Sequence, residues 1–540
     1  MERILFFLFC LRSFGTCDIS GPSGETKAPN VVLIVVDDLG WDDIGLHGSS
    51  QIPTPNIDKL AEEGVVLDNY YTQPICTPSR ASLMTGKYPV RLGLQHDVIS
   101  AATPFGLPSN FKIMPQYLHD KNYDCHIVGK WHLGHSRSEF LPTRRGFKDH
   151  FGYRLGSSDH YSHYGADDSD VPGSLFYGLD LWHNEVPAKE FNGKYSTDIY
   201  THRSTDILRV RGFRLRFFPH FFATELQDHS IRRPLQMHNK SRPLFLYLAY
   251  QAVHAGNPDQ ALQAPQSIVD RFSSSIRNDR RRRYAAMVSA VDTAIGNVMG
   301  AIRANGFAGN TLVFFTNDNG GPINANDRSP GSNYPLRAGK FTLWEGGVRG
   351  TGIFWAPQVL KPGKFGGLSH IVDVLPTILS AAGMSSVPEL DGVSLWKSLS
   401  EKRSENPRTE LLLNIDPVDH TAAYRLGDFK LIKSNGLMDG WFRTPDAANH
   451  SRTIKCKLDD PVFICRGVDR PCLFNIAEDP CEQDDVYADN PDIVKEIMER
   501  LHRYRHEMHP VEDKNVTRLA DPARFDYIWM PWEDLNFRNS

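Results

Sequence analysis

The chain has 540 residues, of which 40% are hydrophobic and 23% are charged, and its formal net charge is −4 at pH 7. This length predicts two or three domains, and the composition is that of an ordinary globular protein. The nearly balanced charge argues against nucleic-acid binding and against electrostatic attachment to a membrane surface.

The N-terminus has the pattern of a secretory signal peptide. A short basic segment precedes the apolar run from Ile4 to Leu11, which is too short to span a bilayer. We expect a leader over about residues 1–17, no membrane span, and delivery through the secretory pathway to the lysosome or the exterior. The alternative is a buried N-terminal helix.

Four apolar runs, each followed by polar side chains, predict the strands of a buried parallel sheet. An amphipathic helix is expected over residues 284–302, between the last two runs. Strands that alternate with helices predict an α/β fold with a large, mostly parallel or mixed sheet sandwiched by helices. The strand-end groups are Asp37 and Asp38 after residues 31–36, Lys130 and His132 after a run through Val128, His254 after a run from Leu244, and Asp318 and Asn319 after residues 312–315.

After about residue 400 the pattern changes to short strands of antiparallel type and a helix that begins at Pro491 with Asn490 as its N-cap. We expect a large domain over residues 28–400 and a smaller α+β subdomain with an antiparallel sheet over residues 409–540. In an oxidising compartment, Cys456, Cys465, Cys472 and Cys481 are disulfide candidates with three possible pairings. N-glycosylation sequons begin at Asn239, Asn449 and Asn515.

The polar groups are expected to meet, because ligands of such sheets bind beyond the carboxyl ends of the strands. Asp37, Asp38, Asp318 and Asn319 supply only oxygen ligands, which suit Ca²⁺ or Mg²⁺ better than zinc. An isolated Asp-Asp pair is ordinarily a turn or a helix cap. The recurrence of polar residues at four strand ends favours a metal site instead.

Several cations are candidates for the same site: Arg80, Lys130, His132, His254 and Lys340. Each alone is ordinarily a surface or capping group. Beside a divalent cation they predict a pocket for the anion of a sulfate or phosphate ester. Arg80 lies one turn into a helix expected to begin at Pro78, so Cys76 and the anion are expected near its positive end.

The residues around Cys76 leave its role open. A buried thiol belongs inside an apolar strand, yet polar and turn-forming residues follow Cys76. A thiolate nucleophile needs a base, and no papain-like signature surrounds it.

The stretch CTPSRASLMTG, from Cys76 to Gly86, resembles the sulfatase signature Cys-x-Pro-Ser-Arg followed by Thr-Gly. The stretches DNYYTQPICTPSR, GKWHLG, LPTRRGFKDHFGY, DNGG and LWEGGVRG resemble the arylsulfatase B, or N-acetylgalactosamine-4-sulfatase-like, group of the type I sulfatases. The resemblance runs from about Asn30 to Trp396. It implies an alkaline-phosphatase-like fold and removal of sulfate from an aryl sulfate or a sulfated sugar, such as the N-acetylgalactosamine 4-sulfate of glycosaminoglycans.

The resemblance also implies that formylglycine-generating enzyme oxidises Cys76 to Cα-formylglycine. One hydroxyl of the hydrated aldehyde then attacks sulfur, and the second expels sulfate. One Ca²⁺ ion would be held by Asp37, Asp38, Asp318 and Asn319, with residue 76 beside it. Carried over in the same way, Arg80 and Lys130 would hold residue 76, His132 would help to deprotonate it, and His254 and Lys340 would bind the sulfate.

Three departures from the group limit what the resemblance implies. Residues 255–258 read AGNP where the group has Glu-Pro, which puts the sugar specificity in doubt. Residues 210–240 are a basic and aromatic insertion, interpreted as a substrate-facing loop, an ordinary surface insertion or a gene-model error. Several cysteines of the group are missing, so its disulfides cannot be transferred.

Two other functions remain open on the sequence. One is a phosphate or phosphonate monoester hydrolase of the same superfamily, although a two-zinc phosphatase would require more His and Asp ligands. The other is a catalytically silent protein that binds sulfated glycans.

Overall fold

The computed structural model describes residues 28–167, 176–209, 238, 241–323, 326–401, 406–446, 453–457, 470–512 and 515–535. The expected leader, nearly all of the 210–240 insertion, Asn239, Asn449 and Cys465 lie outside these ranges, so the expectations about them stay predictions. Asn515 lies within them and is exposed.

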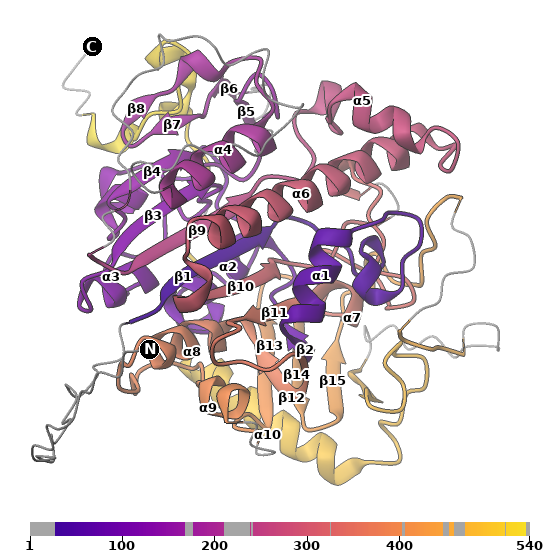
Figure 1. Ribbon diagram of the computed structural model, residues 1–540. Coiled ribbons are helices and arrows are strands. Elements are labelled where there is room, and N and C mark those ends of the chain that lie inside the picture. The colour runs from indigo at the N-terminus through magenta and orange to yellow at the C-terminus, as the bar shows by residue number, and fades with distance from the viewer. Residues whose placement is uncertain are drawn as a thin grey trace, which may run out of the picture.

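A mixed sheet of ten strands forms the centre of the molecule (Figure 1). The strand order is β12-β2-β11-β10-β1-β9-β3-β4-β7-β8. Its strands are β1 (Asn30–Val36), β2 (Val65–Tyr71), β3 (Asp124–Gly129), β4 (Asp149–Gly152), β7 (Trp182–His183), β8 (Val186–Pro187), β9 (Leu244–Tyr250), β10 (Thr311–Asn317), β11 (Gly352–Trp355) and β12 (Gly363–His370). A separate two-stranded sheet pairs β5 (Tyr164–Asp167) with β6 (Phe176–Leu179).

The four strands predicted from apolar runs are neighbours at the middle of this sheet. β10, β1, β9 and β3 are adjacent and parallel to one another. Their carboxyl ends therefore lie along one edge of the sheet, and the residues that follow them are brought together. The predicted α/β fold with a mostly parallel, mixed sheet is confirmed.

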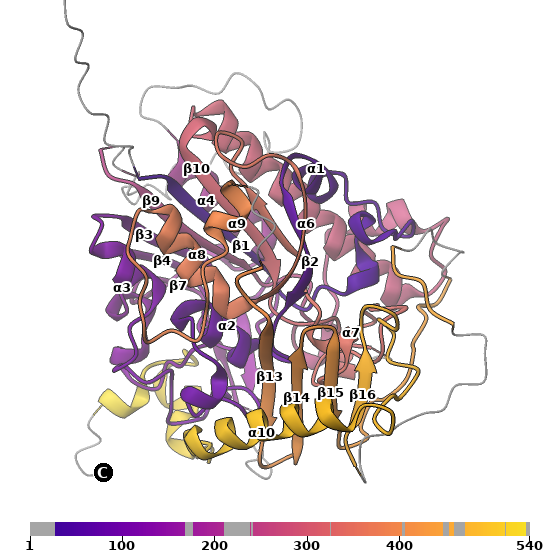
Figure 2. The same cartoon turned by 90° about the horizontal axis from the view of Figure 1, so that it is seen from below.

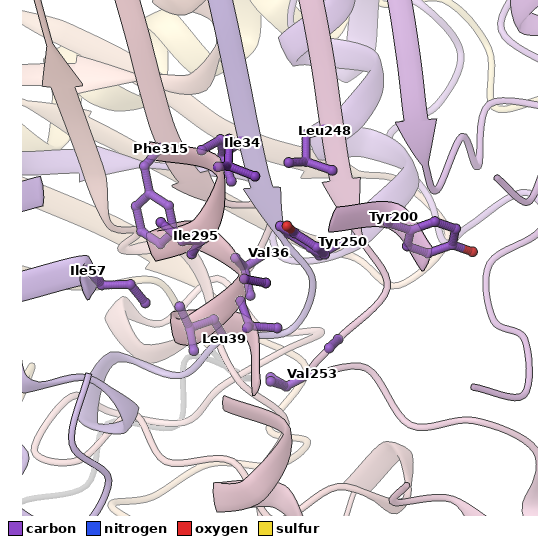
Figure 3. Packing of buried hydrophobic residues seen from close by; sticks show 14 of the residues in the cluster. Ile34, Val36, Leu39, Ile57, Tyr200, Leu248, Tyr250, Val253, Ile295 and Phe315 are labelled. Atoms are coloured by element: carbon purple, nitrogen blue, oxygen red, sulfur yellow. The ribbon is translucent and has the colours of Figure 1, made fainter. Parts of the chain in front are cut away.

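Alternating residues of β1 fill two hydrophobic cores on opposite faces of the sheet, because successive side chains of a strand point to opposite sides. Val32, Ile34 and Val36 belong to the core on one face, and Val31, Leu33 and Val35 belong to the core on the other. Figure 3 shows the first core, where Ile34 and Val36 lie among residues of neighbouring strands and of the helix that contains Ile295. A strand buried on both faces explains the uninterrupted β-branched run.

Helices cover both faces. α1 (Pro55–Glu63), α4 (Ser196–Leu208) and α6 (Asp279–Ala304) pack against the first core, with α5 (Gln266–Val269) beside α6 (Figure 1). α2 (Cys76–Thr85), α3 (Met114–His119), α8 (Val374–Ala381) and α9 (Trp396–Ser400) cover the other face (Figure 2). The short α7 (Glu345–Val348) lies near the four-stranded sheet of the C-terminal part.

α6 is the one helix of the described residues that is long and apolar enough to cross a membrane. However, 72% of its apolar window is buried inside the protein, as expected for a core helix. It begins where the Asn278 side chain accepts a hydrogen bond from the backbone N–H of Arg281 at 2.9 Å, which is an N-cap contact.

The C-terminal part forms a four-stranded antiparallel sheet of β13 (Glu410–Asp416), β14 (Thr421–Leu426), β15 (Phe429–Lys433) and β16 (Cys472–Asn475). α10 (Pro491–Glu507) runs across its strands (Figure 2). Asn490 holds the N-cap position, but its side-chain amide donates to the Val486 carbonyl at 2.9 Å instead of accepting from the helix. The two-part architecture matches the sequence, while the boundaries at 400 and 409 stay predictions.

One disulfide of the C-terminal part joins Cys456 and Cys481. Cys472 is disulfide-bonded as well. This agrees with an oxidising compartment, where such bonds persist.

A buried ion-pair cluster links the C-terminal sheet to the large domain. The Lys430 ammonium on β15 lies 2.9 Å from a carboxylate oxygen of Glu345 and 2.8 Å from one of Glu482, and all three side chains are fully buried. Tyr71 at the end of β2 donates a 2.8 Å hydrogen bond to Glu345. Lys430 therefore bridges two carboxylates at the junction of the two sheets.

We expect Lys430→Met to lower the free energy of unfolding by about 3–5 kcal/mol, because two buried carboxylates lose their counter-charge. Lys433→Met is the matched control, since Lys433 lies on the same strand but is exposed, and a change within about 0.5 kcal/mol is expected. Urea denaturation of both variants measures the difference. Equal stability of the two variants would contradict the structural role assigned to Lys430.

Candidate active site

The strand-end residues form one buried cluster. Asp37 and Asp38 follow β1, and Asp318 and Asn319 follow β10, the adjacent strand; none of the four is more than 1% exposed. The backbone N–H of Asp38 donates to a carboxylate oxygen of Asp318 at 3.3 Å. The structure thus places three carboxylates and one amide within a single interior site.

Cys76 is the first residue of α2, with Ile75 as N-cap, so the helix begins two residues before the expected start at Pro78. Its Sγ lies 3.5 Å from Asp37 Oδ1. Ligand atoms of Cys76, Asp37 and Asp318 lie within 4.8 Å of one another, and so do those of Cys76, Asp38 and His254. Residue 76 therefore stands at the centre of the cluster, at the positive end of α2.

The environment of Cys76 is that of a protonated thiol. Burial, with a smaller contribution from Asp37, raises the pKa of Cys76 well above its usual value, although Lys130 opposes this. Of the described cysteines, Cys76 and Cys125 form no disulfide. Because a cysteine nucleophile reacts as the thiolate, this site disfavours direct attack by the unmodified side chain.

Arg80 and Lys130 neutralise the carboxylates. Arg80, one turn into α2, donates to Asp318 Oδ2 from Nη2 at 2.7 Å and from Nε at 3.0 Å. Lys130 Nζ, just after β3, donates to Asp37 Oδ2 at 2.6 Å. Arg80 and Lys130 are 0% exposed, so each forms a charge-assisted contact shielded from solvent.

These contacts set the pKa values of the two carboxyl groups in opposite directions. Burial raises the pKa of Asp37, but Lys130, His254 and Arg80 outweigh it and hold the pKa below its usual value. Burial and the nearby Asp37 raise the pKa of Asp318 despite Arg80. The buried cations therefore compensate Asp37 more fully than Asp318.

His132 has a defined tautomer. Its Nε2 lies 3.2 Å from the Ile99 carbonyl, which can only accept, so Nε2 carries the proton and Nδ1 has a free lone pair. Nδ1 is buried without a hydrogen-bond partner. Burial, followed by Lys130 and Arg80, lowers the pKa of His132 well below its usual value, so the ring is neutral.

His254 and Lys340 lie beside Asp38. Lys340 Nζ donates to Asp38 Oδ2 at 2.8 Å, and His254 Nε2 lies 3.7 Å from the same oxygen. His254 Nδ1 lies 2.7 Å from the Ala255 carbonyl, which assigns the proton to Nδ1. All ten residues singled out from the sequence are thus brought into one site.

Sequence reasoning missed two residues of the site. Ser79, inside the Cys76–Gly86 signature, accepts a 2.9 Å hydrogen bond from the Gln73 backbone and donates to the Asp318 backbone carbonyl, which ties α2 to the end of β10. Asp327 lies in the loop after β10 and contacts both Lys340 and His254. Its position in a polar loop, away from any strand end, gave no signal.

The oxygen groups fit a hard divalent cation. Asn319 donates from Nδ2 to Asp38 Oδ1 at 2.7 Å, which orients its amide. This leaves Asn319 Oδ1 fully buried with no hydrogen-bond partner among the described residues, and such an orphaned acceptor is costly unless something binds it. Three carboxylates and one amide oxygen are the donor set that Ca²⁺ or Mg²⁺ prefers.

Comparisons with known proteins agree with this geometry. Residues 29–384 match the Sulfatase family model. Arylsulfatase J from Mus musculus is 37% identical over 95% of this chain and 81% of its own length, and N-acetylgalactosamine-6-sulfatase from Sus scrofa is 32% identical over 72% of this chain and 69% of its own. The crystal structure of Ps i-CgsB in complex with k-i-k-neocarrahexaose is 28% identical, with a TM-score of 0.70 over 95% of this chain and 100% of that one.

These matches identify the class of protein as an enzyme that hydrolyses sulfate esters. The chain belongs to the type I sulfatase family. It is a sulfatase, which hydrolyses sulfate esters of the aryl sulfate or sulfated glycan type.

We expect calcium to stabilise the wild-type protein, because it relieves repulsion among buried carboxylates. At free calcium about 100-fold above Kd, linkage gives about 2.7 kcal/mol, seen as a higher melting temperature than in EGTA. Asn319→Leu is expected to abolish most of this calcium-dependent shift. Asn414→Leu, a buried asparagine of the C-terminal sheet, is the control and should keep it; a wild-type melting temperature insensitive to calcium would contradict the metal site.

Proposed function

We propose that this sulfatase is calcium-dependent and that its nucleophile is Cα-formylglycine made from Cys76 by formylglycine-generating enzyme. The observation that carries the proposal is the position of Cys76. It opens α2 and faces Asp37 at 3.5 Å inside a ring of oxygen donors and buried cations. A protonated thiol is a poor nucleophile there, whereas a hydrated aldehyde at that point has a metal site, cations and a base beside it.

Asp37, Asp38, Asp318 and Asn319 would hold the calcium ion, which would supply positive charge to polarise a sulfate oxygen. The converted residue 76 supplies the hydroxyl nucleophile. The chain's own residues bind, orient and move protons around these two groups.

Arg80 and Lys130 fix the nucleophile and its surroundings. Each is buried and held by a carboxylate, Arg80 by Asp318 and Lys130 by Asp37. Their positions are set before substrate arrives, so their charge acts on the reacting group without reorganisation.

His132 serves as the base in this proposal. Its Nδ1 lone pair is buried and unpaired, while the Ile99 carbonyl holds Nε2–H. A neutral imidazole in this tautomer accepts a proton from the nucleophile at Nδ1.

His254 and Lys340 bind the sulfate. They lie together at the side of the cluster where both approach Asp38 Oδ2, at 3.7 and 2.8 Å. One of the two also protonates the leaving oxygen. Lys340, as a cation, complements the charge of the sulfate group throughout.

We propose that the natural substrate is a terminal sulfated N-acetylgalactosamine of a glycosaminoglycan, with the 4-sulfate as first choice. Relatives named N-acetylgalactosamine-6-sulfatase, at 30–32% identity, support the sugar but make the 6-position the competitor. The Cys456–Cys481 disulfide and the exposed Asn515 support passage through the secretory pathway to the lysosome or the exterior.

We expect the calcium-loaded enzyme to hydrolyse p-nitrophenyl sulfate with a kcat/KM at least about tenfold above that for p-nitrophenyl phosphate, a difference of about 1.4 kcal/mol in transition-state binding. Steady-state kinetics on both esters measures this. A preference for the phosphate would replace the proposal with a phosphomonoesterase, and no turnover of either ester would favour a silent glycan-binding protein.

Cys76→Ala is the control for both esters and should lose essentially all turnover. Rates on trisaccharides ending in N-acetylgalactosamine 4-sulfate or 6-sulfate test the sugar assignment. Faster release from the 6-sulfate would correct the position, and release from neither would contradict the proposed substrate.

A further inference from the structure

Asp327 places a fourth carboxylate in the anion pocket. Its Oδ2 contacts Lys340 Nζ and lies 3.4 Å from His254 Nε2, the two groups assigned to the sulfate. The Asp327 side chain is 24% exposed, whereas the three carboxylates of the metal site are at most 1% exposed.

The backbone holds this carboxylate in place at some conformational cost. Asp327 and the next residue, Arg328, both have positive φ, 48° and 56°. Two successive non-glycine residues in the left-handed region are unfavourable, and such strain is typical of functional segments. The loop therefore directs Asp327 toward Lys340 and His254.

Asp327 is ionised under working conditions. Burial raises its pKa, but Lys340 and His254 outweigh this and hold the pKa of Asp327 below its usual value. An ammonium group has three donors, so Lys340 can contact Asp38, Asp327 and one substrate oxygen at the same time.

Asp327 changes the net charge of the pocket. Asp37, Asp38 and Asp318 balance Arg80, Lys130 and Lys340, so a bound divalent ion leaves the pocket with a charge of at least +2. Asp327 lowers this charge by one unit. A sulfate monoester carries one negative charge, whereas inorganic sulfate and, near neutral pH, a phosphate monoester carry about two.

We propose that Asp327 is a specificity-determining residue that selects singly charged sulfate esters over doubly charged anions. The inference rests on the proposed sulfatase site. Repulsion by Asp327 grows in proportion to the charge of the ligand, so it disfavours phosphate monoesters more than sulfate monoesters. It also weakens binding of the inorganic sulfate product, which favours its release.

The test uses the calcium-loaded, mature enzyme and Asp327→Asn. Titration calorimetry with inorganic sulfate and inorganic phosphate should show dissociation constants at least about tenfold lower in the variant, which corresponds to about 1.4 kcal/mol. KM for p-nitrophenyl sulfate should fall by a smaller factor, about threefold. The ratio of kcat/KM for aryl sulfate to that for aryl phosphate should therefore decrease.

Two further variants serve as controls. Asp259→Asn removes an exposed carboxylate a few residues after His254 and should leave every constant unchanged. Asp327→Glu keeps the negative charge and should keep the wild-type ratio of kcat/KM for aryl sulfate to that for aryl phosphate. A changed ratio in this variant would contradict selection by charge, even if Asp327→Asn folds poorly.

Unchanged affinity for both inorganic anions in Asp327→Asn would overturn the inference. An equal shift for the monoanionic ester and the dianions would also overturn it, because selection by charge would then be absent. Neither outcome would contradict the proposed function. That proposal is contradicted if the wild-type enzyme does not hydrolyse aryl sulfate.

Discussion

Three carboxylates buried at the carboxyl edge of the sheet impose the main electrostatic constraint on this protein. Asp37 and Asp318 follow adjacent strands, and each is held by a buried cation, Lys130 at 2.6 Å and Arg80 at 2.7 Å. A buried charge that loses its partner is strongly destabilising. The strand order, the start of α2 and the residues after β3 together bring the buried cations to these carboxylates. The same arrangement places Cys76 beside them.

The central part of the site could be predicted from the sequence, because it depends on local patterns. Uninterrupted apolar runs such as residues 31–36 indicate strands buried on both faces, and a parallel sheet aligns the ends of such strands. The structure places β10, β1, β9 and β3 side by side, so Asp38, Lys130 and Asp318 meet. No knowledge of long-range contacts was needed beyond the rule for parallel sheets.

Features that depend on tertiary contacts were not predictable. Pro78 marked the expected start of α2, yet the helix begins at Cys76. Asn490 occupies a cap position but bonds Val486 instead of the helix. Asp327 lies outside the predicted strands, and its contacts with Lys340 and His254 join segments that are separated in the sequence.

The state of residue 76 is the most direct test of the account. Mass spectrometry of the peptide containing residue 76, from protein secreted by cells that express formylglycine-generating enzyme, measures it. We predict an aldehyde or its hydrate in place of the thiol, and we expect the specific sulfatase activity to rise in proportion to the converted fraction. Fully retained thiol in protein that hydrolyses aryl sulfate would contradict the central claim.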